Sequence, residues 1–349
     1  MRAGMSSRAT RRLACAAALL FTAAFAVAQQ QAETVFTEGE VCRRDGSGNL
    51  RSLEIGDTLV VGDSVVTKAH SSAELKLLAG DSSIKIRQNT VFTLGELNSG
   101  GEKRSVLRTI VGSASMKFGK LTGKEPLLGT ATCVCGVRGT EVELFGAMDG
   151  SSVVAVRSGA ISLESAGNSV ELAANEAVEV SPGMAPGPKF SWIGKELDFS
   201  AWDQGKLESF LSDPASSAQK VAQQLASFSA SIAELLPQLA EQKAAYDAAY
   251  SELKKLVDAK EDAEAESLRQ GTVFPLMEAQ ATLILNIRYY ALSSLSLRRY
   301  VLGGMYMQLK TRHPLDPSEA GFAAFLGIYN RALADFEAGV VPQLVEADI

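Results

Sequence analysis

Residues that carry chemistry are scarce in this chain, which has 2 histidines and 4 cysteines among its 349 residues. A tetrahedral metal site needs three or four nitrogen or sulfur ligands around one ion, and His70 and His313 lie in different halves of the sequence. The chain has no Gly-rich phosphate loop, and no serine in a strand-to-helix turn with a histidine near it. Glu141 and Glu143 share a strand face, which we interpret as its solvated side. The sequence therefore predicts no catalytic site, no metal site and no cofactor.

Long apolar runs are scarce too, and the clearest one stands near the N-terminus. It covers about 15 residues from Leu13 to Val27, fewer than the ~20 that a membrane-spanning helix needs. Four arginines and no acidic residue precede it, and Ala26-Val27-Ala28 ends it with the small residues that a signal peptidase reads. We predict a Sec-type signal peptide over residues 1–28, cleaved near Ala28, and a periplasmic or secreted bacterial protein. An uncleaved segment that anchors the chain in the membrane is the alternative.

Positive charge is in short supply once the signal peptide is removed. The formal net charge of the chain is −6, and the loss of four arginines with residues 1–28 takes it to −10. Nucleic acids and anionic lipid surfaces attract basic patches, so neither is an expected partner. The remaining chain is long enough for two domains with apolar cores. We expect a protein of the cell envelope as its partner.

A period-two pattern of apolar and polar residues runs over residues 35–183 and is typical of short β-strands. "AELKLLAGDSSIKI" predicts a hairpin, because Gly80-Asp81 separates two strands that each have an apolar face. Short strands at regular spacing predict an all-β domain that is solenoid-like or sandwich-like. Similar pairs of turn residues recur along this half: Gly56-Asp57, Gly62-Asp63, Ser158-Gly159 and Asn175-Glu176.

A helical pattern follows a Pro- and Gly-rich linker at residues 184–200. Asp213 before a proline is typical of a helix start, and Pro237 should kink or divide the helix that follows. The charged stretch Asp258–Glu266 predicts either a hairpin connection to the next helix or a solvated helical turn. Residues 201–349 thus predict an antiparallel helical bundle, and the whole chain an α+β multidomain fold. A coiled-coil-like apolar stripe, which offers a surface for oligomerisation, consists of Val221, Leu225, Phe228, Ile232, Leu235 and Leu239.

Three cysteines remain after cleavage, an odd number for an oxidising compartment. Cys133 and Cys135 stand one residue apart in "TCVCGVRGTEVEL" and face the same side of a strand, where they are poorly placed to bond each other. One disulfide from Cys42 to either of them, with the third thiol buried, is one interpretation. Three separate buried thiols are a second. A metal site and a redox-active pair are the remaining interpretations.

Several motifs stand in order along the β half: "LEIGDTLVVGDSVV", "SSAELKLLAGDSSIKI", Val137-Arg138-Gly139-Thr140 and "VELAANEAVEVSPG". In this order they resemble the periplasmic domain of the FecR family, over less than half of the chain. The resemblance implies an all-β module that binds protein partners and, in the best-known members, relays an outer-membrane signal to a sigma factor. We expect no cytoplasmic anti-sigma segment here, because the apolar run begins at Leu13.

The Val-Arg-Gly-Thr motif has two interpretations within this resemblance. A structural role would pair Arg138 with a carboxylate or with turn carbonyls, because a partly buried guanidinium needs acceptors. Gly139 would allow a close backbone approach, and Thr140 would re-enter the strand. The alternative is that Arg138 lines a partner-binding face.

These observations predict a secreted or periplasmic, non-enzymatic binding or scaffold protein of the bacterial cell envelope, with the FecR-like domain as its interaction module. An envelope signalling regulator, anchored by an uncleaved N-terminal segment, is one alternative. A thiol-dependent envelope enzyme centred on Cys133 and Cys135 is the other.

Overall fold

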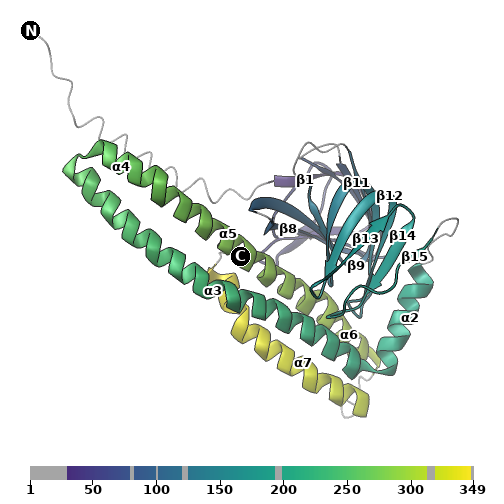
Figure 1. The fold of residues 1–349 in the computed structure, drawn as a ribbon. Coiled ribbons are helices and arrows are strands. Elements are labelled where there is room, and N and C mark those ends of the chain that lie inside the picture. The colour runs from purple at the N-terminus through teal and green to yellow at the C-terminus, as the bar shows by residue number, and fades with distance from the viewer. Residues whose placement is uncertain are drawn as a thin grey trace, which may run out of the picture.

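The computed structural model describes residues 30–78, 82–99, 101–119, 125–192, 199–312 and 319–346. An all-β domain comes first and helices follow it, as predicted (Figure 1). The predicted signal peptide and the turn at Gly80-Asp81 lie outside the described residues. No helix within the described ranges is both long enough and apolar enough to cross a membrane.

The strands of the first domain enclose one apolar core. Along β7, Ser82, Ile84 and Ile86 are buried and the residues between them are exposed, as period-two alternation predicts. Among the described strands, β10 runs parallel to β9 and every other pair runs antiparallel. The described strands are joined in one sheet, and its mostly antiparallel pairing is unlike a solenoid of parallel coils. The strands are β1 (Gln30–Glu38), β2 (Val41–Arg44), β3 (Leu50–Ser52), β4 (Thr58–Val60), β5 (Ser64–Thr67), β6 (Ser72–Leu77), β7 (Ser82–Ile86), β8 (Val91–Ser99), β9 (Glu102–Phe118), β10 (Leu127–Gly129), β11 (Val134–Gly146), β12 (Ser152–Ser165), β13 (Asn168–Ala173), β14 (Glu176–Val180) and β15 (Phe190–Ser191).

Both Gly-Asp pairs ahead of β4 and β5 form tight turns, as predicted. Gly56 and Gly62 have φ angles of +91° and +94°, a region that glycine enters without steric cost. The carboxylate of Asp63 accepts the backbone N–H of Val60 at 2.8 Å, and Asp57 makes the equivalent bond. Each aspartate thereby satisfies a donor three residues before it.

Two of the predicted hairpin turns do not form hairpins. β12 continues through Ser158-Gly159, and β13 and β14 pair end to end along the same edge of β12. Gly159 (φ +80°), inside β12, and Asn175 (φ +66°), in the turn between β13 and β14, adopt left-handed conformations. The hairpin predictions were wrong because positive φ also occurs at a bulge within a strand, or in a turn between two strands that both pair with a third.

Strand pairing continues past the predicted end of the β domain at Gly183. The chain turns back after β14, and β15 pairs with β14 in antiparallel register. Trp192 follows β15 and packs in a small cluster with Phe145 and Ala177. The first part of the Pro- and Gly-rich segment is therefore a connection inside the β domain, and residues 193–198 lie outside the described residues.

The helices form an antiparallel bundle, as predicted (Figure 1). α3 runs outward, and a nearly continuous run from α4 to α6 returns along it. The outward helix ends in the predicted connection, where Lys260 adopts a left-handed conformation (φ +62°). α7 packs against α3 on the inner part of the bundle. The helical segments are α2 (Phe199–Ser212), α3 (Pro214–Ala259), α4 (Asp262–Leu268), the π-helical η2 (Arg269–Val273), α5 (Phe274–Ser296), the π-helical η3 (Leu297–Leu302), α6 (Gly303–Arg312), α7 (Ala320–Gly339) and α8 (Val341–Glu346).

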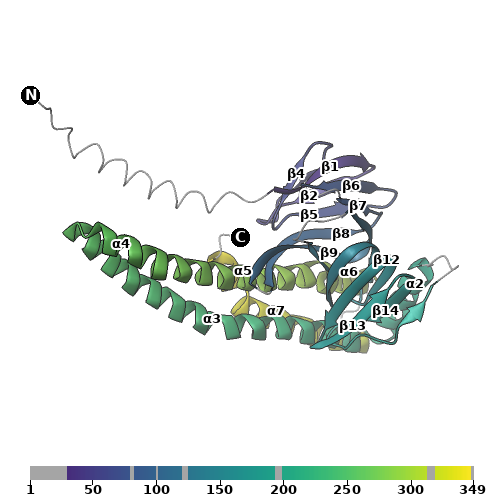
Figure 2. The ribbon, with the colours of Figure 1, turned by 45° about the horizontal axis from the view of Figure 1, so that its top comes forward.

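α3 is one helix of 46 residues. Asp213 caps its start as predicted, because its carboxylate accepts the N–H of Ser216 at 3.0 Å. Pro237 lies inside the helix, which follows a curved course (Figure 2). Of the two predicted effects of this proline, division of the helix does not occur. Packing against α5 and α7 holds the helix together where proline removes one hydrogen bond.

The β domain sits against the helical run formed by α5 and η3 (Figure 2). An apolar cluster shared by both parts includes Ile110 of the β domain and Val221 and Val301 of the helices. The backbone N–H of Asn98 on β8 donates to the side chain of Asn286 on α5 at 2.8 Å. The far end of the hairpin, where α3 meets α4, extends well beyond the β domain (Figure 1).

Candidate functional site

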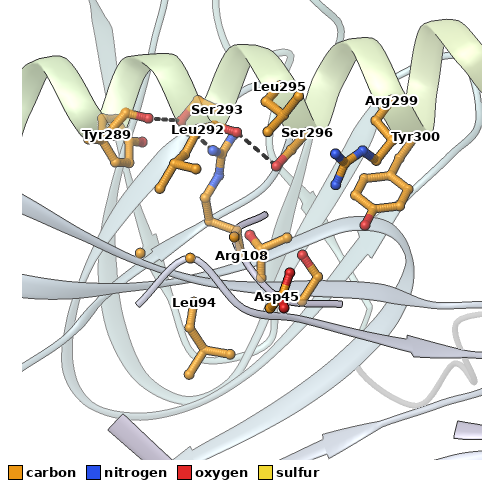
Figure 3. Close-up of a pocket in the computed structure, with 15 residues that line it drawn as sticks. Asp45, Leu94, Arg108, Tyr289, Leu292, Ser293, Leu295, Ser296, Arg299 and Tyr300 are labelled. Carbon is orange, nitrogen blue, oxygen red and sulfur yellow. Dashed lines mark hydrogen bonds between the residues drawn. The ribbon is translucent and has the colours of Figure 1, made fainter. Parts of the chain in front are cut away.

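A buried arginine stands where the β domain meets α5. Arg108, on β9, is 5% exposed. Its Nε and Nη2 donate to the carbonyl oxygen of Thr130 at 3.2 and 2.9 Å, and its Nη1 donates to the hydroxyl of Ser293 on α5. Its guanidinium carbon lies 5.7 Å from the ring centroid of Tyr289, a cation–π contact. Figure 3 shows Arg108 reaching towards the helix at Ser293.

Residues 129–133, "GTATC", form a turn that accommodates the Arg108 side chain. The N–H of Thr130 donates to the carbonyl of Cys133 at 3.0 Å, which closes a tight turn ahead of β11. The Thr130 hydroxyl lies 3.2 Å from the Cys133 sulfur. A Cβ at Gly129 would lie 2.9 Å from Cγ of Arg108, so glycine leaves room for the arginine to pass. The turn therefore presents the Thr130 carbonyl to Arg108.

The partners that the described residues give Arg108 are all neutral: a carbonyl, a hydroxyl and an aromatic ring. A buried charge is costly unless hydrogen bonds or an opposite charge compensate it. Burial raises the pKa of the Tyr289 phenol, and the nearby Arg108 opposes that rise. Tyr289 therefore stays neutral at physiological pH and supplies no counter-charge. The junction between the two parts thus holds positive charge away from bulk water.

Cys133 and Cys135 lie beside this site, and they are 5% and 0% exposed. The Cys135 thiol donates to the Cys133 sulfur, which lowers the pKa of Cys133 and raises the pKa of Cys135 well above its ordinary value. A redox-active or nucleophilic thiol needs access to its substrate, whereas both sulfurs lie inside the apolar core. Their arrangement favours structural thiols. The described residues also contain no cluster of three or more His, Cys, Asp or Glu side chains that could hold a metal ion.

The three cysteines that follow the predicted signal peptide are free in the structure. Val41 and Cys42 are neighbours on β2, so their side chains point to opposite faces of the sheet. Val41 packs in the same core as Cys133 and Cys135, and Cys42 faces away from it with partial exposure. The predicted disulfide from Cys42 is not formed, because strand alternation turns its sulfur away from the other two.

The Val-Arg-Gly-Thr motif, residues 137–140, forms a bulge in β11. Arg138 pairs with Ala160 and Glu141 with Ser158, so three steps along β11 oppose two along β12. The bulge lies where β11 leaves its pairing with β10 and joins β9. The first and last side chains of the motif are buried, at 4% and 1% exposure. The side chains of the two middle residues lie outside the described part of the chain, so the predicted pairing of Arg138 stays a prediction.

Glu143 is buried rather than solvated, which corrects the expectation for its strand face. It is 3% exposed and lies between two arginines, Arg87 at 3.3 Å and Arg157. Both guanidinium groups also lie over aromatic rings, those of Phe145 and Trp192. Period-two alternation could not reveal this burial, because the covering arginines come from distant segments. The cluster links the end of β7 to β11 and β12.

Sequence reasoning missed Arg108, Tyr289 and Ser293 as a unit. One signal was available for the arginine, which interrupts the apolar strand in "SVLRTIVG". No comparable signal marks Ser293, because the adjacent Ser294 looks the same in the sequence. The hydrogen bond between Arg108 and Ser293 joins residues 185 positions apart, and local patterns carry no information about such a pairing.

No protein-family model matches the chain, and no curated protein matches it. Among solved structures, one crystal structure of a candidate anti-sigma factor from Parabacteroides distasonis is similar over 41% of this chain and 65% of its own chain. The identity is 17% and the TM-score 0.33. A second crystal structure with the same description matches 40% of this chain and 59% of its own, at 16% identity and a TM-score of 0.25. Both matches span less than two thirds of those proteins.

Proposed function

We propose that this chain is an exported, non-enzymatic binding protein of the bacterial cell envelope. Its FecR-like β domain serves as a protein-interaction module, and its helical hairpin is an arm that carries a second contact surface. The observation that carries the proposal is the arrangement of the two parts. The β domain is fixed against one portion of the hairpin, while the other end extends past it (Figure 1).

The junction between the parts has the features of a stiff connection. Apolar side chains from both parts form one cluster, and Arg108 and Asn98 donate hydrogen bonds across the junction. Interfaces between domains that move freely are more polar than this. A contact surface on the arm is therefore held at a defined position relative to the β domain.

The outer end of the arm carries side chains of the kind that protein interfaces use. Tyr246 and Tyr250 stack with ring centroids 5.7 Å apart, and Tyr250 is 52% exposed. Val257 and Phe274 are also exposed there, by 48% and 38%. Aromatic side chains are enriched at protein interfaces. The connection Asp258–Glu266 adds five acidic residues against one lysine, so a partner with basic and apolar side chains suits this end.

Two observations support a non-enzymatic role. The thiols that a redox enzyme would use are buried in the core. The sequence has only two histidines, so it offers few residues for histidine-dependent acid–base catalysis.

Site-specific photo-crosslinking in cells tests the binding role. A photoreactive phenylalanine analogue in place of Tyr250 should give a discrete crosslinked protein in the envelope fraction. The same analogue in place of Gln238, an exposed residue of the inner part of α3, is the matched control and should give none. Absence of any protein adduct at the outer end of the arm, or equal adducts at both positions, would contradict this surface.

Cell fractionation and N-terminal sequencing test the export. A mature chain that begins at Gln29 and remains in the soluble periplasmic or secreted fraction is the expected result. A full-length chain that resists carbonate extraction would instead favour the anchored signalling regulator.

A further inference from the structure

A small pocket lies between the β domain and the helical run, next to Arg108. Its volume is about 30 Å³. Arg108 approaches it from the β domain, and Arg299 and Tyr300 project from the helix on the other side (Figure 3). Other side chains with hydroxyl groups also line the pocket, those of Ser64, Thr93, Ser293 and Ser296.

The lining of this pocket has an excess of positive charge. Two arginines contribute to it, against the single carboxylate of Asp45. That carboxylate already accepts the side-chain amide and the backbone N–H of Asn49, at 3.0 and 2.8 Å. These bonds lower the pKa of Asp45 and hold its charge on the loop. Arg299 lies over the ring of Tyr300, and no carboxylate among the described residues forms an ion pair with it.

Hydrogen-bond donors at the pocket lack acceptors. The hydroxyl oxygen of Tyr300 is buried, and no described residue bonds to it. The guanidinium of Arg108 has five N–H groups, and the hydrogen bonds to Thr130 and Ser293 use three of them. Buried polar groups in native proteins are nearly always satisfied. An acceptor inside the pocket would satisfy these donors.

We propose that this pocket binds one small monovalent anion, a halide or an ion of similar size such as formate, between Arg108, Arg299 and the hydroxyl of Tyr300. One water molecule occupies about 10–15 Å³ on this measure, so the pocket admits a small ion with a water and excludes sugars and phosphate esters. The ion offsets the buried charge of Arg108 and contacts both parts of the protein. The ion therefore stabilises the junction, independently of any partner bound at the outer end of the arm.

Thermal unfolding of the mature protein tests the proposal. Sodium chloride, bromide and formate are titrated against sodium gluconate at constant ionic strength, because gluconate is too large for the pocket. A saturable rise in Tm is expected with the small anions. Tyr300→Phe and Arg299→Gln should weaken the apparent dissociation constant at least tenfold. Arg51→Gln removes an arginine that is 54% exposed and pairs with Asp57, and this control should leave the titration unchanged.

Bromide also gives a direct readout that does not depend on stability. Crystals of the mature protein in bromide should show an anomalous peak between Arg108 and Tyr300, and crystals of Tyr300→Phe should show a weaker one or none. The proposal is overturned by a Tm rise that is the same in gluconate. It is also overturned by a pocket without bromide at saturating concentration, or by a titration that Tyr300→Phe and Arg299→Gln leave unaltered.

Discussion

Ser293 and Ser294 are neighbouring serines of α5, and both are 0% exposed. Their hydroxyl groups differ in one respect. The Ser293 hydroxyl accepts an N–H of Arg108 and donates to the carbonyl of Tyr289 at 2.7 Å. The Ser294 hydroxyl is buried without a partner among the described residues. Replacing each serine in turn by alanine therefore separates the hydrogen bond to Arg108 from the other effects of removing a buried hydroxyl.

Only Ser293→Ala is expected to lower the unfolding free energy. Ser293→Ala leaves a buried N–H of Arg108 without its acceptor, which costs about 1–3 kcal/mol. Alanine is a better helix former than serine by roughly 0.5 kcal/mol, so the net loss of unfolding free energy is about 0.5–2.5 kcal/mol. Ser294→Ala has the same helix-propensity gain and breaks no bond. Its unfolding free energy should stay the same or rise by up to about 1 kcal/mol.

Urea unfolding of the two purified variants measures the difference. Far-UV circular dichroism follows the helices, and fluorescence of Trp192 and Trp202 follows the side of the β domain near α2. Ser293→Ala should lower the midpoint by both signals, because the junction couples the two parts. Equal destabilisation by the two substitutions, or a larger loss for Ser294→Ala, would refute the role assigned to the hydrogen bond between Arg108 and Ser293.

Three further predictions follow from the β domain. In the native protein an alkylating reagent should modify Cys42, whereas the buried thiols of Cys133 and Cys135 should react only after unfolding. Mass spectrometry of the labelled peptides checks this, and a disulfide to Cys42 would contradict it. Gly146→Ala should lower the unfolding free energy by about 1–3 kcal/mol, because the added Cβ would lie 2.5 Å from the backbone oxygen of Ile110. In the control Gly136→Ala the added Cβ has no atom within 4 Å, so this variant should be neutral or slightly stabilising in urea unfolding. Burial raises the pKa of Asp63 in the folded state, so folding favours the protonated carboxyl group. This contribution to stability is lost as the pH rises from the ordinary carboxyl pKa through the raised pKa of the folded state. Asp63→Asn should flatten that part of a Tm-against-pH profile, and an unchanged profile would contradict the assignment.

Local patterns predicted the parts of the fold that local chemistry decides. Alternating apolar residues predicted the strands of the all-β domain, and Asp213 marked the start of α3. They failed where a residue has more than one use. Gly159 and Asn175 tolerate positive φ and predict hairpin turns, whereas Gly159 lies inside β12 and Asn175 lies in the turn between β13 and β14, which both pair with β12. Pro237 predicts a kink or a division of its helix, and packing against α5 and α7 keeps that helix undivided.

The candidate site was harder to predict, because its chemistry depends on residues that are distant in sequence. Glu143 looks like a solvated strand residue until Arg87 and Arg157 cover it. Arg108 looks like an interruption of an apolar strand until Ser293 approaches it from α5. Burial and partner identity arise from the docking of the two parts, and a pattern within one strand or helix does not contain them.

The overhang of the helical hairpin gives the molecule the mechanics of a lever. The contact between Asn98 and Asn286 lies on the β domain's side of α5, and the tip begins at Asp262. The 24 positions between Asp262 and Asn286 span ~36 Å at 1.5 Å per residue. A rotation of ~5° about the junction thus displaces the tip by ~3 Å. A load at the tip therefore acts as a torque on the contacts between α5 and the β domain, which include the bonds of Asn98 to Asn286 and of Arg108 to Ser293.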